Sequence, residues 1–98
     1  MVPVIYAPEA ERDLDEITAY IAKDNPKAAE QFGYRLIARS ELLGTFPKLG
    51  RPVHGERSVR VLIESPVRIY YRLGPADRSV EILRFWHASR DPDSLTMD

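Results

Sequence analysis

The chain contains no cysteine. Disulfide bonds and thiolate metal sites are therefore excluded, and a cytoplasmic location is expected because structural disulfides are rare there. No stretch approaches the roughly 18 apolar residues of a membrane-spanning helix. The first residues also lack the basic region and apolar run of a secretion signal. These absences predict a protein that does not associate with membranes.

Patterns for metal ions and nucleotides are missing as well. The histidines, His54 and His87, lie far apart, and no carboxylate has the helical spacing of a metal ligand to either. Residues 49–52 contain one glycine and no lysine–serine pair, so they do not form a phosphate-binding loop. Ser89 lacks the glycines of a nucleophile elbow. We therefore expect neither a metal nor a cofactor.

The length and composition predict one small domain over residues 1–98. Of the 98 residues, 44% are hydrophobic and 30% charged, which is typical of a folded protein. A chain this short buries only a modest core, so it is expected to gain stability from a partner. The polar residues 91–98 are expected to form a frayed tail.

The net charge of −1 hides an uneven distribution. Residues 1–31 contain seven acidic and three basic residues, whereas residues 32–90 contain eleven basic and five acidic residues. Ten of those eleven are arginine, whose guanidinium group forms forked hydrogen bonds with phosphate or carboxylate. The basic part is therefore where we expect an anionic partner to bind. The alternative is that these charges only coat a solvated surface.

A short strand over residues 2–6 and two helices with a very short link are predicted first. Pro8 suits the first position of one helix, and Asn25 and Pro26 suit the cap and first position of the next. Gly44 and Pro47 end the second helix. The buried sides are marked by Ala10, Leu14, Ile17 and Ile21 in the first helix, and by Ala29, Phe32, Leu36, Ile37 and Leu43 in the second.

A loop over residues 46–57 and three strands over residues 59–64, 67–73 and 79–87 complete the chain. Short, turn-forming connections make these strands an antiparallel meander. The order β-α-α-β-β-β predicts an α+β fold, in which a helical hairpin packs on one face of a small, mainly antiparallel sheet.

The last strand is apolar on both sides, which suits a central strand or one whose second face meets another chain. Strict alternation places Val80, Ile82 and Trp86 on one side, and Leu83 and Phe85 on the other, together with His87.

Cations and one imidazole gather toward the end of this predicted sheet. His87 lies at the exit of the last strand, where imidazole can transfer protons near neutral pH, and Arg90 follows it. Arg68 and Arg72 occupy alternate positions of the neighbouring strand and so share a face, and Arg60 extends that row. We expect these groups to converge on one edge, open to an anion. The alternative is a structural histidine beside solvated arginines.

Two further candidates, Arg51 and His54, lie in the predicted loop. Positioned polar residues in loops often act in binding or catalysis, although most are simply solvated.

Five segments in this order resemble toxins of the RelE/ParE superfamily of bacterial type II toxin–antitoxin modules. They are Ala-Glu-Arg-Asp-Leu-Asp-Glu-Ile (10–17), Asn-Pro-Lys-Ala-Ala (25–29), Phe-Pro-Lys-Leu-Gly-Arg (46–51), Arg-Ile-Tyr-Tyr-Arg (68–72) and Trp-His-Ala-Ser-Arg-Asp (86–91). The resemblance implies the β-α-α-β-β-β fold and a growth-inhibiting activity. It also implies a hetero-oligomer with a cognate antitoxin, encoded beside the toxin, that winds an extended or helical segment around it.

The resemblance leaves the target open, because RelE-like members cut messenger RNA on the ribosome and ParE-like members inhibit DNA gyrase. A RelE-like chain would be a metal-independent endoribonuclease. His87 would then transfer protons, and Arg51, Arg68 and Arg90 would grip the phosphate. The tail beyond Arg90 has neither the tyrosine nor the lysine of many ribonuclease members.

A ParE-like chain needs no catalytic residue, and the missing tail and the helical hairpin favour it slightly. This sequence nevertheless lacks the Trp-Gly that often follows the first helix of ParE members. A third alternative is a remnant that is no longer toxic and only binds an antitoxin. The arginines expected to bind an acidic antitoxin segment or a nucleic acid are Arg60, Arg68, Arg72, Arg84 and Arg90.

Overall fold

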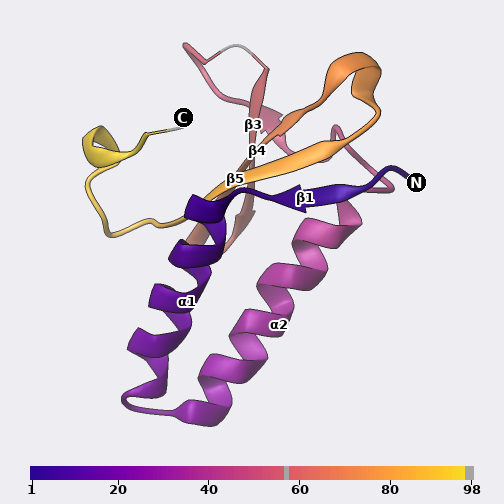
Figure 1. The fold of residues 1–98 in the computed structure, drawn as a ribbon. Coiled ribbons are helices and arrows are strands. Elements are labelled where there is room, and N and C mark those ends of the chain that lie inside the picture. Colours follow the sequence, from indigo (N-terminus) through magenta and orange to yellow (C-terminus); the bar gives the residue numbers. More distant parts are fainter. Residues whose placement is uncertain (57, 97–98) are drawn as a thin grey trace.

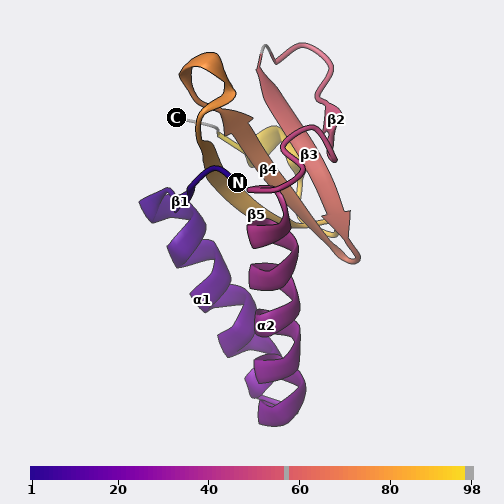
Figure 2. The ribbon, with the colours of Figure 1, turned by 90° about the vertical axis from the view of Figure 1, so that its right-hand side faces the viewer.

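A computed structural model of the chain describes residues 1–56 and 58–96. Two helices form a hairpin that covers one side of a five-stranded sheet and extends past its end (Figures 1 and 2). The predicted α+β fold is confirmed. The elements are β1 (Val4–Tyr6), α1 (Pro8–Ala22), α2 (Pro26–Leu42), β2 (Arg51–Pro52), β3 (Val59–Glu64), β4 (Val67–Leu73) and β5 (Val80–His87), with short 3₁₀ turns at Pro75–Asp77 and Pro92–Ser94.

Local sequence explains where the helices begin. α1 starts at Pro8, with two glutamates in its first turn that interact favourably with the helix dipole. Asn25 caps α2, because its Oδ1 accepts the N–H of Ala28 at 3.0 Å, as the sequence predicts. Gly33 lets the helices approach closely, since a Cβ there would lie 3.2 Å from Thr18 Cγ2. Within the described ranges, neither helix has the length and apolar character needed to cross a membrane.

The strands lie in the order β1-β5-β4-β3-β2. β1 runs parallel to β5, and the remaining pairs are antiparallel, so the predicted meander of β3, β4 and β5 is confirmed. The loop predicted over residues 46–57 is corrected in one respect, because Arg51 and Pro52 pair with Val61 and Arg60 to form β2. This strand is only two residues long and contains a proline, which is tolerated at a sheet edge and resembles a loop in sequence.

Two hydrophobic clusters lie on the two faces of the sheet, one facing the helices and an outer one on the opposite face. Val53 from the loop and Leu95 from the tail pack against the outer cluster. The tail predicted to fray therefore makes contacts up to Thr96, whose carbonyl accepts a hydrogen bond from Arg84 Nη1 at 3.0 Å, while residues 97–98 lie outside the described part. The helix-facing cluster contains Ala10, Phe32, Leu36, Leu43, Leu62, Val67, Ile69, Tyr71, Val80, Ile82 and Phe85, and the outer cluster contains Val59, Val61, Tyr70, Leu83 and Trp86.

The two faces of β5 differ from the prediction. Val80 and Ile82 lie on the same face, as predicted, and this face is toward the helices. Phe85, predicted on the opposite face, lies on this face too. Trp86 lies in the outer cluster with Leu83. The assignment of Phe85 and Trp86 from strict alternation is therefore wrong.

A β-bulge is the physical reason. Tyr71 of β4 pairs with Ile82, whereas Tyr70 pairs with Arg84, so Leu83 is an extra residue in β5. One inserted residue reverses the alternation of every side chain that follows it in the strand.

Candidate functional site

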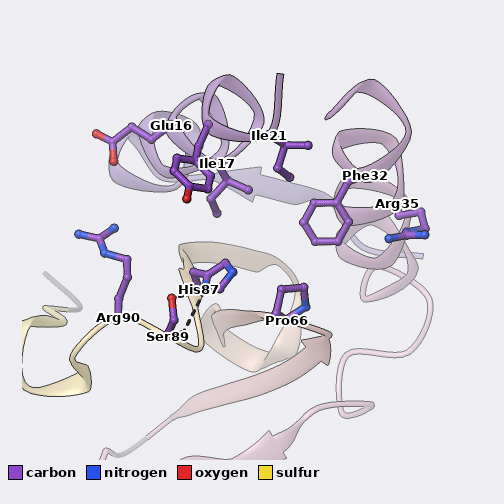
Figure 3. Close-up of a pocket in the computed structure, with 10 residues that line it drawn as sticks. Glu16, Ile17, Ile21, Phe32, Arg35, Pro66, His87, Ser89 and Arg90 are labelled. Carbon is purple, nitrogen blue, oxygen red and sulfur yellow. Dashed lines mark hydrogen bonds between the residues drawn. The ribbon is translucent and has the colours of Figure 1, made fainter. Parts of the chain in front are cut away.

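An open cavity of about 570 Å³ lies between the helical hairpin and the nearby end of the sheet (Figure 3). We call this cavity the hairpin pocket. At the sheet end of the pocket, the N–H of Ala88 donates to the Pro66 carbonyl at 2.8 Å, which holds the end of β5 against the turn before β4. Apolar residues Ile17, Ile21, Phe32 and Pro66 line it, together with Glu16, Tyr20, Arg35, His87, Ser89 and Arg90.

His87 points into the hairpin pocket from the end of β5 (Figure 3). It pairs with Val67, whose side chain belongs to the helix-facing cluster. The N–H of Ser89 donates to His87 Nδ1 at 3.0 Å, and Ser89 Oγ lies 2.7 Å from the same nitrogen. Because Nδ1 accepts from the backbone, the proton of a neutral ring lies on Nε2. The basic nitrogen of the neutral ring, Nδ1, is thus occupied by Ser89, and Nε2 can only donate a hydrogen bond to a partner.

Two guanidinium groups lie at the rim of the hairpin pocket, opposed by the carboxylate of Glu16. The guanidinium of Arg90 stacks 4.2 Å from the centroid of the Trp86 ring. The guanidinium carbon of Arg35 lies 5.1 Å from the centroid of the Phe32 ring. Arg35 Nε lies 3.9 Å from a carboxylate oxygen of Glu64. Such a long, exposed ion pair is weak, so Arg35 stays available to a partner. The rim therefore carries an excess of positive charge above an apolar floor.

Arg84, by contrast, is engaged inside the protein. Its Nε and Nη2 donate to the two carboxylate oxygens of Asp13 at 2.7 and 3.0 Å. The pair is largely buried, with 14% and 6% of the side chains exposed. The hydrogen bonds that Arg84 donates to Asp13 raise the pKa of Arg84, although burial opposes that shift. A guanidinium held in this way is not free to bind an external phosphate.

Arg72 and Arg60 also have partners within the chain. Arg72 Nε lies 3.3 Å from a carboxylate oxygen of Glu81 on the neighbouring strand. Arg60 Nη1 donates to the Gly50 carbonyl at 2.6 Å. Both arginines therefore stabilise local structure, one across the sheet and one beneath the loop that follows α2.

The expected convergence of cations around His87 is wrong. The bulge at Leu83 turns His87 toward the helices, while Arg68 pairs with Trp86 on the outer face. Arg51 lies on β2 at the far edge of the sheet, three strands from β5. Of the catalytic candidates, His87 and Arg90 line one pocket, and of the binding candidates, Arg84 and Arg90 lie over the same Trp86 ring. His54, also a candidate, lies exposed in the loop after β2.

Sequence reasoning missed three residues that shape this region. Asp13 falls within the apolar stripe of α1, three residues after Ala10 and four before Ile17. An acid at such a position signals a buried partner, so Asp13 could have been found. Glu16 and Arg35 lie on exposed helix surfaces that no sequence pattern distinguishes. In the part of the chain that the structure describes, no group of three or more His, Cys, Asp or Glu residues could hold a metal ion.

Comparisons with known proteins agree with this fold. A family model described as "ParE toxin of type II toxin-antitoxin system, parDE" matches residues 4–92. "Putative toxin Y4kP" of Sinorhizobium fredii (strain NBRC 101917 / NGR234) is 42% identical over 79 residues, which are 79% of this chain and 78% of that protein.

Two solved structures are similar in fold. A chain from the chromosomal ParDE TA system of P. aeruginosa has a TM-score of 0.76 at 23% identity, covering 91% of this chain and 98% of its own. A chain from the toxin–antitoxin complex RelBE2 of Mycobacterium tuberculosis has a TM-score of 0.60 at 24% identity, covering 88% and 96%.

Proposed function

Because this chain belongs to the ParE toxin family of type II toxin–antitoxin systems, we propose that it inhibits DNA gyrase by binding it. This activity needs no catalytic residue and stops when a cognate antitoxin binds the toxin. The observation that favours it most is the separation of His87 and Arg68 on opposite faces of the sheet. Gyrase acts in the cytoplasm, so the proposal places this chain there.

Messenger RNA cleavage is the second candidate. A ribonuclease needs a base, an acid and cations around a single phosphate. Here Arg68 faces away from His87, and Arg84 is neutralised by Asp13. The observation in favour of cleavage is that His87 and Arg90 line the same pocket. His87 and Arg90, without the other arginines, can bind an anion but lack the further cations that phosphate cleavage needs.

The hairpin pocket supports the antitoxin part of the proposal. Its apolar floor includes Ile17, Ile21 and Phe32, and its rim carries Arg35 and Arg90. A segment that orders on binding suits a concave surface, where its apolar side chains are buried and its carboxylates bind guanidinium groups. An acidic, amphipathic antitoxin segment would therefore occupy the hairpin pocket in a hetero-oligomer.

The test combines purified components with expression in cells. Purified DNA gyrase is assayed for supercoiling with increasing amounts of this chain, and transcripts are mapped after induction of the chain alone. We expect inhibited supercoiling and intact transcripts. The variants His87→Ala and Arg68→Ala should inhibit gyrase as the original chain does.

Two other outcomes would each identify a different function. Cut transcripts that disappear in His87→Ala would identify an endoribonuclease. A chain that leaves both supercoiling and transcripts unchanged, and that does not slow growth, would be a remnant that only binds an antitoxin.

A further inference from the structure

The turn between α2 and β2 presents two large apolar side chains to solvent. Phe46 is 56% exposed and Leu49 is 46% exposed. The N–H of Leu49 donates to the Phe46 carbonyl at 3.1 Å, and the N–H of Phe46 donates to the Leu42 carbonyl at 3.0 Å. The segment therefore continues the end of α2 as a compact turn, which we call the 46–49 turn. Neither apolar side chain belongs to either hydrophobic cluster.

The 46–49 turn is fixed from beneath by a buried tyrosine. The hydroxyl of Tyr71, which is fully buried, donates to the Pro47 carbonyl at 2.7 Å and accepts the N–H of Gly50 at 2.9 Å. Burial raises the pKa of Tyr71, so the hydroxyl keeps the proton that it donates. Arg60 adds a hydrogen bond of 2.6 Å to the Gly50 carbonyl. These bonds hold both ends of the turn.

Glycine is required next to this anchor. A Cβ at Gly50 would lie 2.7 Å from Tyr71 Cε1 and 2.7 Å from the Val61 carbonyl oxygen. The backbone at Gly50 therefore packs against the Tyr71 ring with no room for a side chain. A turn held this tightly has little conformational freedom to lose when a partner binds, which favours affinity.

The surface of the 46–49 turn suits a protein better than a nucleic acid. The 46–49 turn has a single cation, Lys48, and the acid Asp77 lies beside it, with 3.9 Å between Lys48 Nζ and a carboxylate oxygen, so this surface has no excess of positive charge. Binding to a phosphate backbone depends on several cations. Aromatic side chains such as that of Phe46 are enriched at protein–protein interfaces, and an exposed apolar patch marks a site of protein contact. An open hollow of about 420 Å³ is lined by Thr45, Phe46, Pro47, Lys48, Leu49 and Asp77.

The 46–49 turn and the hairpin pocket lie at opposite ends of β4. Pro66, which lines the hairpin pocket, precedes that strand, and Asp77, which contacts the turn, follows it. Seven residues of strand span roughly 23 Å. The hairpin pocket is concave and suits a segment that orders on binding, whereas a rigid turn with projecting apolar side chains suits a partner that is already folded.

We propose that the 46–49 turn is the surface through which this chain contacts DNA gyrase, an inference that rests on the proposed function. Phe46 and Leu49 provide most of the affinity by entering apolar sites on the folded enzyme. The antitoxin occupies the hairpin pocket at the other end of the molecule, so the two contacts depend on different residues.

The test uses the full chain carrying Phe46→Ser and Leu49→Ser together, with purified DNA gyrase. The matched control is Tyr34→Ser, because Tyr34 is 69% exposed on α2 and lies outside the turn. We expect the double variant to need at least about tenfold more protein for half-inhibition of supercoiling, the loss expected when contacts of this kind are truncated. Tyr34→Ser should match the original chain, and circular dichroism should show the same folded state for all three.

The outcomes separate this inference from the proposed function. If the original chain fails to inhibit gyrase, both are overturned. If the original chain and the double variant inhibit equally, only the inference is overturned. The same holds if the double variant weakens binding to the antitoxin encoded beside this chain as much as it weakens gyrase inhibition. Leu49→Lys, which adds a charge at an exposed position, should reduce inhibition even if the double variant folds poorly.

Discussion

Asp13 of α1 forms a bidentate ion pair with Arg84 of β5, with nitrogen–oxygen distances of 2.7 and 3.0 Å. The same carboxylate accepts the backbone N–H of Phe85 at 3.1 Å. β1 pairs with β5 only as far as the Tyr6–Ile82 pair, so the edge of β5 is uncovered beyond that point. Asp13 therefore supplies the hydrogen-bond acceptor that a longer β1 would have provided, and it joins α1 to the sheet.

Replacing Asp13 should destabilise the fold strongly. Asp13→Ala leaves the Arg84 charge buried without its partner, which typically costs about 3–5 kcal/mol. Urea denaturation, followed by the fluorescence of the single tryptophan, measures the loss. Asp15→Ala, on the exposed side of the same helix, should change stability by less than about 0.5 kcal/mol.

A double variant separates the cost of an unpaired charge from the value of the pair. Asp13→Leu with Arg84→Met should be more stable than Asp13→Leu alone, because no charge remains buried. If the double variant is the less stable of the two, burial of the charge is not the cause.

Tyr71→Phe should loosen the 46–49 turn while keeping the core filled. Without the hydroxyl, the N–H of Gly50 and the carbonyl of Pro47 lose their partner. A buried polar group left unsatisfied costs about 1–3 kcal/mol. Denaturation should show that loss, and hydrogen exchange should show faster exchange of the Gly50 amide. Tyr34→Phe is the matched control, because the Tyr34 ring is exposed. Equal exchange of Gly50 in both variants would contradict the anchoring role of Tyr71.

Alkaline pH should lower the stability of the fold. Burial raises the pKa of Tyr6, reinforced by its hydrogen bond to Glu41, and burial also raises the pKa of Tyr71. An unfolded tyrosine loses its proton near pH 10. Above that pH the folded state binds more protons than the unfolded state, so the free energy of unfolding falls as pH rises. The contribution is fully present below about pH 10 and is lost toward the raised pKa values.

Urea denaturation between about pH 8 and pH 11 measures this loss. The double variant Tyr6→Phe and Tyr71→Phe should be less stable at neutral pH but should have a flatter profile above about pH 10. An unchanged slope in that variant would assign the alkaline loss to other groups.

The helices and most strands are predictable because their signals are local. Asn25 and Pro26 mark the start of α2 through capping chemistry, which depends only on neighbouring backbone groups. Alternation in β3 and β4 follows from the pleat, which places successive side chains on opposite faces of the sheet, and both faces are partly buried here. β2 escapes prediction because its two residues acquire a strand conformation only by pairing with β3.

The arrangement of the site is less predictable because one residue decides it. The bulge at Leu83 is marked by neither glycine nor proline, and it results from how β5 pairs with β4 over its whole length. It reverses the side on which His87 lies, so His87 and Arg68 do not converge as expected. The buried partner of Arg84 lies 71 positions away in sequence, so its neutralisation depends on the tertiary fold.

Charge reversal at the rim of the hairpin pocket should weaken antitoxin binding and leave gyrase inhibition intact. Arg90→Glu replaces a guanidinium held over Trp86 with a carboxylate, next to the existing acid Glu16. An acidic antitoxin segment would then meet like charge, which costs affinity and slows association. We expect at least about tenfold weaker binding to the antitoxin encoded beside this chain, with a smaller salt dependence than the original. Arg12→Glu, exposed on α1 outside the pocket, should bind normally. Equal weakening by both variants would mean that overall charge, and not the hairpin pocket, selects the antitoxin.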